Sequence, residues 1–241
     1  MIYVMSDLHG QYNAFLKMLE LIKFTDEDEL YILGDIIDRG PNPLEIYDYI
    51  KDKPNIHMLM GNHERMMMDY YDEKPRSWLN SRADDYRLWM RNGGKVTEDA
   101  MNAREKDEQE EIKEFFNNLE YYKLLDIDGE KFILSHARPC IYGLASLEDE
   151  LAYNIKDQSI LWNREISSRR MKNGYRCIHG HTPVQYAFCV DTIVAYSHGE
   201  VIDIDCGCAG AYSLACLRLD DMKQFYIDEL DEIPRSSDDE E

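Results

Sequence analysis

The sequence predicts an α/β protein whose first third alternates strands with helices. Three short apolar runs, at residues 2–5, 30–33 and 56–60, have the length of buried strands. A segment with helical spacing or a helix-start pattern follows each run. Alternation of this kind is typical of parallel strands joined by helical crossovers. We therefore expect a parallel sheet in this part of the chain.

The helices of this first third are indicated by apolar spacing and by capping residues. In the first expected helix the apolar side chains share one face; they are Tyr12, Phe15, Leu16, Leu19 and Ile22. The second is expected to begin with Asn42 as its cap, Pro43 in the first turn and Glu45 reaching back. A third is expected over residues 63–70.

Residues 72–120 are expected to be a mainly helical segment that shapes the entrance to a cleft. Its apolar side chains form two faces, Leu79, Ala83, Tyr86 and Met90, and then Ile112, Phe115, Phe116 and Leu119. The rest of the chain carries short strands, expected near residues 122–127, 131–135, 175–179, 200–204 and 212–219. No repeat or linker appears, so we expect one domain over residues 1–232 and a disordered acidic tail over 233–241.

The composition disfavours several classes of partner. The 241 residues include 27 basic and 48 acidic side chains, a formal net charge of −21. Such a surface repels nucleic acid and anionic membranes, so we expect neither as a partner. The chain starts without a signal-like segment, and its six cysteines form no paired framework, which predicts a cytoplasmic protein with reduced thiols. The spacing of Cys206 and Cys208 is not the CxxC form, so we interpret them as buried thiols.

Polar motifs follow five of the expected strands. They are "SDLHG" (6–10), "GDIIDRG" (34–40), "GNHE" (61–64), "SHA" (135–137) and "HGHT" (179–182). Each motif taken alone reads as a turn, since Gly, Asp, Asn and His are turn residues. Turns alone do not explain five such motifs, all with possible metal ligands directly after a strand. In open α/β sheets, ligands bind at the carboxyl ends of the strands, which is where these motifs are expected to lie.

The side chains in these motifs form a plausible set of metal ligands. The candidates are Asp7, His9, Asp35, Asn62, His136 and His181. A mixture of carboxylate, imidazole and amide groups favours manganese, iron or zinc over magnesium or calcium. The number of donors fits two ions, with Asp35 able to bridge them. Two cations about 4 Å apart can activate a water and neutralise a phosphoryl group.

The ordered motif series resembles the phosphoprotein phosphatase branch of the calcineurin-like metallophosphoesterases, and especially its phage and bacterial members. Three methionines after "GNHE", the "NGG" of residues 92–94 and the "WNRE" of residues 162–165 add to the likeness, which covers roughly residues 1–219. The resemblance implies a calcineurin-like fold, a mixed β-sandwich flanked by helices. It also implies a phosphatase with two divalent transition-metal ions, manganese first, with iron or zinc as alternatives.

The resemblance also implies a role for each motif residue. Asp7, His9 and the bridging Asp35 would hold the first ion, and Asp35, Asn62, His136 and His181 the second. Arg39 and Arg164 would grip the substrate phosphate, assisted by Asn62 and His63. His63 would protonate the leaving oxygen, with Asp38 fixing its orientation. The nucleophile would be a metal-bridging hydroxide, so no phosphoenzyme is expected.

The substrate implied by the resemblance is phosphoserine or phosphothreonine in a protein, and also phosphotyrosine. Related bacterial enzymes cleave diadenosine tetraphosphate, and in those we expect Ala in place of Asp38 and Asp in place of Glu64. The residues present here therefore favour a protein phosphatase over a dinucleoside polyphosphate hydrolase. A binding protein with an inactive phosphatase fold is disfavoured because every expected ligand position is filled. The acidic charge disfavours a nucleic-acid end phosphatase.

Overall fold

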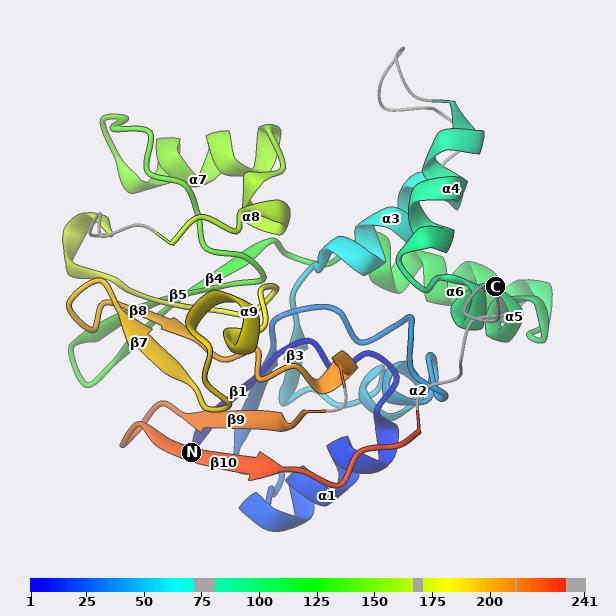
Figure 1. The fold of residues 1–241 in the computed structure, drawn as a ribbon, viewed down its shortest axis with the longest axis horizontal. Coiled ribbons are helices and arrows are strands. Elements are labelled where there is room, and N and C mark those ends of the chain that lie inside the picture. Colours follow the sequence, from blue (N-terminus) through cyan, green and yellow to red (C-terminus); the bar gives the residue numbers. More distant parts are fainter. Residues whose placement is uncertain (72–80, 167–170, 211, 233–241) are drawn as a thin grey trace.

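The computed structural model describes residues 1–71, 81–166, 171–210 and 212–232. Two five-stranded sheets pack against one another, and helices cover their outer faces (Figure 1). This arrangement confirms the predicted α/β class and the mixed β-sandwich flanked by helices. The expected tail, and residues 72–80 of the expected helical segment, lie outside the described residues.

Each sheet contains both parallel and antiparallel strand pairs. The first has the order β10-β9-β1-β2-β3 and the second the order β4-β5-β6-β8-β7. In the first sheet β1, β2 and β3 are parallel, and in the second β5, β6 and β8 are parallel. The strands are β1 (Ile2–Met5), β2 (Glu29–Ile32), β3 (Ile56–Met58), β4 (Tyr122–Ile127), β5 (Glu130–Ser135), β6 (Arg176–His179), β7 (Val194–Tyr196), β8 (Val201–Asp203), β9 (Leu214–Arg218) and β10 (Lys223–Ile227).

Alternation along the central strands builds three apolar cores. Val4 of β1 lies between the two sheets, whereas its neighbours Tyr3 and Met5 face the helices on the outside of the first sheet. Likewise Leu134 of β5 lies between the sheets, whereas Ile133 faces the helices on the other side. Because successive side chains of a strand point to opposite faces, each of these strands is buried on both sides.

Eight of the described α-helices form two groups on the outer faces of the sheets, whereas Val184 of the ninth joins the core between the sheets. Apolar side chains of α1–α6 join the core of the first sheet, and those of α7 and α8 join the core of the second. Figure 1 shows α7 and α8 on the opposite side of the molecule from α1. The helices are α1 (Tyr12–Ile22), α2 (Glu45–Ile50), α3 (Asn62–Tyr71), α4 (Arg82–Arg91), α5 (Lys95–Asn102), α6 (Lys106–Asn117), α7 (Leu147–Lys156), α8 (Ser159–Trp162) and α9 (Val184–Phe188).

Two local predictions about the helices are wrong. The second helix begins at Glu45, and Asn42 does not cap it. Instead the side-chain amide of Asn42 donates to the carboxylate of Asp231, and the backbone N–H of Asn42 donates to the carbonyl of Gly10. In α4 the buried residue is Trp89, whereas Ala83, which the expected apolar face included, is exposed.

The cysteines are free, as expected. Four of the six are buried, and Cys206 and Cys208 are among them. Burial raises the pKa of both thiols, so they stay protonated and behave as small apolar side chains. Among the described helices none has both the length and the apolar content needed to cross a bilayer.

Candidate metal centre

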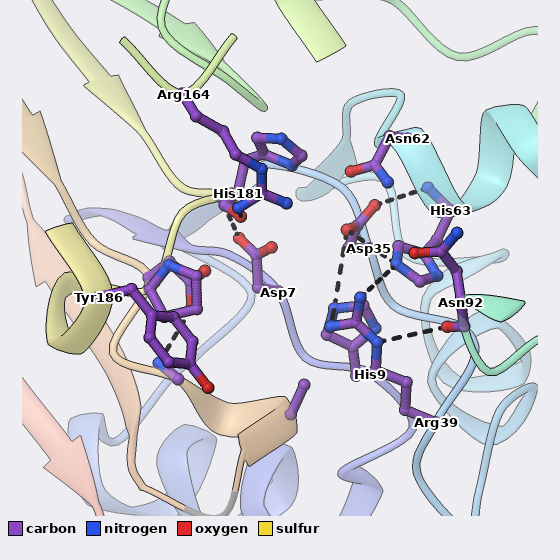
Figure 2. A pocket seen from close by; sticks show the side chains of 14 residues that line it. Asp7, His9, Asp35, Arg39, Asn62, His63, Asn92, Arg164, His181 and Tyr186 are labelled. Atoms are coloured by element: carbon purple, nitrogen blue, oxygen red, sulfur yellow. Dashed lines mark hydrogen bonds and ion pairs between the residues drawn. The ribbon is translucent and has the colours of Figure 1, made fainter. Parts of the chain in front are cut away.

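The predicted ligand residues converge at one edge of the two sheets. Asp7 and His9 follow β1, Asp35 follows β2, and Asn62 is the first residue of α3 just beyond β3. His136 and His181 follow β5 and β6 in the second sheet. Figure 2 shows Asp7, His9, Asp35, Asn62 and His181 converging from these loops. They line a cavity of about 160 Å³, whereas His136 is fully buried and is not among the lining residues. Side chains far apart in the sequence therefore share one site.

Asp35 occupies the centre of this group. Its Oδ2 atom lies 3.7 Å from Nε2 of His9, 3.5 Å from Nε2 of His136 and 3.9 Å from Nε2 of His63. Two sets of three residues have ligand atoms close enough to share one ion, and both sets contain Asp35. This is the position that a carboxylate bridging two cations would occupy.

The contacts of His136 fit a bound cation. Its Nδ1 lies 2.8 Å from the carbonyl oxygen of Leu33, an acceptor, so Nδ1 carries the hydrogen and Nε2 presents a lone pair. Nε2 lies 2.7 Å from Oδ1 of Asn62 and 3.1 Å from Nδ1 of His181. The lone pairs of His136 Nε2 and Asn62 Oδ1 repel one another at this distance unless a cation lies between them, so this donor set suits a metal ion.

The contacts of His9 also fit a positive charge. Its Nδ1 donates to the carbonyl of Ile37 at 2.9 Å, which turns the Nε2 lone pair toward the cavity. The Arg39 guanidinium donates to Nε2 of His9 at 3.1 Å and to Nε2 of His63 at 2.8 Å. Both imidazoles thus accept from one cationic group. Nε2 of His181 is buried and has no hydrogen-bond partner among the described residues.

Burial sets the charge state of these groups. Loss of solvent lowers the pKa of His9 well below its usual value, and nearby Arg39 lowers it further. Burial likewise lowers the pKa of His181, so both rings are neutral at pH 7, as metal ligands must be. Burial and then the Asp7 charge raise the pKa of Asp35 well above its usual value. Divalent cations would reverse that shift.

The geometry allows two ways to complete the site around His9. His63 lies within ligand distance of His9 and Asp35, whereas Asp7 belongs to neither set of three. Asp7 lines the cavity, and its Oδ2 accepts hydrogen bonds from Ser6 Oγ at 2.5 Å and from the His181 amide at 2.9 Å. The choice of Asp7 over His63 as ligand therefore stays a prediction, which the metal content of Asp7→Asn and His63→Asn tests.

Asp38 holds His63 from the side away from the cavity. Its Oδ2 accepts the hydrogen of His63 Nδ1 at 2.6 Å. The Thr97 hydroxyl donates to Oδ1 at 2.6 Å, and Nε1 of Trp89 donates at 3.0 Å to Oδ2. Burial raises the pKa of Asp38 and the hydrogen bonds from Thr97 and Trp89 oppose that shift, so that the pKa is about 7. Helices α4 and α5 thus supply the groups that fix the Asp38–His63 pair.

The backbone of the site is strained where the candidate residues lie. Six of them have positive φ angles between 42° and 72°, namely Asp7, His9, Asp35, Asp38, Arg39 and His181. Such conformations cost free energy in residues other than glycine and persist where the surroundings enforce them, which is typical of functional sites. Beside them, a Cβ atom on Gly180 would overlap Ser6 and Asp7, so glycine lets the His181 loop approach Asp7.

The lining of the cavity also includes two arginines and several residues that are not candidate ligands. Arg39 and Arg164 both line it, as expected, and Arg164 donates to the carbonyl of His181 at 3.3 Å. Asn92, Tyr186 and Asp205 also line it. The position of Asp205 at the end of a late strand predicts that it approaches the site without being a ligand, whereas the sequence does not indicate Asn92 or Tyr186 as site residues. Asn92 could have been found from the "NGG" segment. Nothing in the sequence marks Tyr186.

Glu64 supports the site from behind and does not line the cavity. It is fully buried, and its carboxylate accepts from the backbone N–H groups of Asp35 at 2.8 Å, Ile36 at 2.9 Å and Gly61 at 3.1 Å. Glu64 therefore fixes the loop that carries the central carboxylate. Because Glu64 does not line the cavity, it can influence the choice of substrate only by positioning that loop.

The buried position of Glu64 predicts a pH-dependent stability in the metal-free protein. Burial, and then the charge of Asp35, raises the pKa of Glu64 from 4.5 to about 8. The folded chain therefore keeps a proton that the unfolded chain releases, and this stabilisation is lost as pH rises from about 4.5 to 8. With chelator present, urea unfolding at pH 6 and pH 8.5 should show a smaller decrease in stability for Glu64→Gln than for wild type. An equal decrease in both proteins would show that Glu64 does not contribute.

The comparisons with known proteins agree with this geometry. The profile of the calcineurin-like phosphoesterase family matches residues 1–209. The chain is 24% identical over 216 residues to serine/threonine-protein phosphatase 2 of Salmonella typhimurium, covering 88% of this chain and 90% of that protein. It is 25% identical over 138 residues to the symmetrical bis(5'-nucleosyl)-tetraphosphatase of Erwinia tasmaniensis, covering 56% of this chain and 43% of that protein.

The similarity in fold to solved structures also extends over most of the chain. The crystal structure of a putative diadenosine tetraphosphatase superposes with a TM-score of 0.62 at 12% identity, covering 96% of this chain and 93% of that one. Calcineurin-like phosphoesterases use divalent metals, and the described residues include two sets of candidate ligands. With its family profile, its fold and its cluster of metal-binding side chains in agreement, this chain belongs to the calcineurin-like phosphoesterase family of metal-dependent hydrolases.

Proposed function

We propose that this chain is a dinuclear metal-dependent protein phosphatase that hydrolyses phosphoserine and phosphothreonine, and also phosphotyrosine. One observation carries the proposal: Oδ2 of Asp35 lies 3.5–3.9 Å from three imidazole nitrogens, in a cluster whose cavity two arginines also line. The likeness to serine/threonine-protein phosphatase 2, which spans most of both chains, supports the choice of substrate.

Two divalent cations, with manganese preferred, would be held by Asp35 together with the ligands on either side of it. When bound, they supply positive charge for the phosphoryl group and lower the pKa of an attacking water. Because a water would then be the nucleophile, no side chain of the protein would need to attack the phosphorus atom. The phosphate dianion itself would be bound by Arg39 and Arg164, whose planar forks match phosphate oxygens.

His63 would deliver the proton that the leaving oxygen needs. Its Nδ1–H is held by Asp38, so its Nε2 faces Arg39 and the cavity. Burial lowers the pKa of His63 well below its usual value in the free site, and Arg39 lowers it further. A phosphate dianion beside the ring would raise that pKa and favour a proton on Nε2, which passes to the leaving oxygen as the P–O bond breaks.

A dinucleoside polyphosphate hydrolase is the second candidate. The similarity to a symmetrical bis(5'-nucleosyl)-tetraphosphatase favours it. The pair formed by Asp38 and His63 favours the phosphatase, because the related hydrolases are expected to have alanine at position 38.

A direct comparison of substrates tests the proposed function. We expect manganese-loaded protein to release phosphate from a phosphothreonine peptide and a phosphotyrosine peptide faster than it cleaves diadenosine tetraphosphate. Chelation should abolish the activity and manganese should restore it, because the candidate ligands cluster around the cavity that binds the phosphate. A higher kcat/KM for the dinucleotide would contradict the substrate class. Full activity after complete removal of metal would contradict the mechanism.

A further inference from the structure

Tyr186 presents an unusually exposed aromatic ring at the rim of the catalytic cavity. It lines the cavity, yet 74% of its surface is accessible to solvent. Among the described lining residues it is the one tyrosine, and there is no phenylalanine or tryptophan. Its hydroxyl has no hydrogen-bond partner within the described part of the chain. Folding alone therefore does not explain why an aromatic residue lies here.

The backbone that carries Tyr186 is held firmly in place. Residue Val184, two positions earlier, is fully buried and donates its backbone N–H to the carbonyl of Asp205 at 2.9 Å. The side-chain amide of the intervening Gln185 donates from Nε2 to the carbonyl of Cys206 at 3.0 Å. Helix α9 also follows His181 by only two residues. The ring is thus free on a fixed backbone, which lowers the entropic cost of using it as a contact surface.

From these observations, and resting on the proposed function, we infer that Tyr186 is a specificity-determining residue that packs against the aromatic ring of a phosphotyrosine substrate. Figure 2 shows Tyr186 and Arg39 on opposite sides of the opening, with Arg164 nearby. With the phosphate on the two arginines, the ring bonded to it lies at the rim. Serine and threonine have no ring to place there. An aromatic pair adds about 0.5–1.5 kcal/mol, which converts to roughly a two- to tenfold preference.

The charge of the cavity favours a phosphate monoester over a nucleotide as the source of that ring. Arg39 and Arg164 are the two permanently cationic side chains among the described residues that line it, and they match one phosphate dianion. Three carboxyl groups, those of Asp7, Asp35 and Asp205, line the same cavity. Apart from the two proposed metal ions, the described lining residues include no third cationic side chain that could contact the additional phosphates of a tetraphosphate chain.

The test compares three variants on diadenosine tetraphosphate and on two peptides of the same sequence, one with phosphotyrosine and one with phosphothreonine. We expect Tyr186→Ala to lower kcat/KM for the phosphotyrosine peptide about two- to tenfold, mainly through KM, with little change for phosphothreonine. Tyr186→Phe should retain the wild-type preference because the ring remains. Tyr153→Ala is the matched control, since Tyr153 is 44% exposed on α7 and does not line the cavity.

Two further measurements separate this inference from the proposed function. Inhibition by inorganic phosphate should be the same in wild type and Tyr186→Ala, which shows an intact phosphate site. Calorimetry with non-hydrolysable phosphonate analogues of both peptides should show the same selective weakening even if the protein releases no phosphate, a result that would defeat only the proposed function. Equal effects on both peptides, or none, would overturn the role of Tyr186. A loss confined to diadenosine tetraphosphate would overturn phosphotyrosine as the source of the ring.

Discussion

Replacing Asp35 by asparagine is expected to lower kcat for phosphate release on the order of a thousandfold or more. Its Oδ2 atom lies 3.5–3.9 Å from imidazole nitrogens on both sides of the centre, so one carboxylate serves both candidate ion positions. Asparagine keeps the shape but removes the negative charge that would lie between two cations. We expect the variant to bind less manganese, measured by elemental analysis after dialysis, together with the loss of turnover.

A conservative control separates this effect from a general loss of charge. Asp26→Asn changes an exposed carboxylate outside the cavity and should leave both metal content and turnover unchanged. The circular dichroism spectra of both variants should match that of the wild type. If Asp35→Asn retained its metal and most of its turnover, Asp35 would not be a bridging ligand.

Replacing His63 by asparagine is expected to reduce hydrolysis of alkyl phosphates by about 10²–10⁴-fold and of aryl phosphates much less. An alkoxide needs a proton as it departs, whereas a phenolate with a low pKa does not. The hydrogen bond from His63 to Asp38, at 2.6 Å, orients the ring for this task. The measurement is kcat/KM for a phosphothreonine peptide and for an activated aryl phosphate.

The metal content of this variant, compared with that of Asp7→Asn, decides whether Asp7 or His63 is the metal ligand. If His63 is the acid, His63→Asn should retain both ions, whereas Asp7→Asn should lose the ion next to His9. Equal losses on aryl and alkyl substrates, accompanied by loss of one ion from His63→Asn, would make His63 a ligand. That outcome would follow the grouping of His63 with His9 and Asp35 in the structure.

Much of the site could be predicted from the sequence because its parts occupy equivalent places in the fold. Asp7, Asp35 and His181 each follow a parallel strand, and the carboxyl ends of those strands gather at one edge. A strand is recognised from four or five apolar residues, and the motif after it is then placed without knowledge of the rest of the chain. The spatial convergence of these residues follows from topology.

The supporting residues could not be predicted in the same way. Trp89 and Thr97 contact Asp38 from positions 51 and 59 residues away, and helical periodicity does not reveal which partner a buried face will meet. Asn42 has the sequence of a helix cap, but its tertiary hydrogen bonds to Gly10 and Asp231 replace that local role. Strand β7 is three residues long and partly exposed, so its alternation gives too little signal.

Anomalous diffraction at the manganese edge, on crystals grown with manganese, tests the central claim most directly. The account predicts two peaks roughly 4 Å apart on either side of the Asp35 carboxylate. One should lie next to His9 and the other among Asn62, His136 and His181. A single peak, or peaks that do not contact Asp35, would contradict the account.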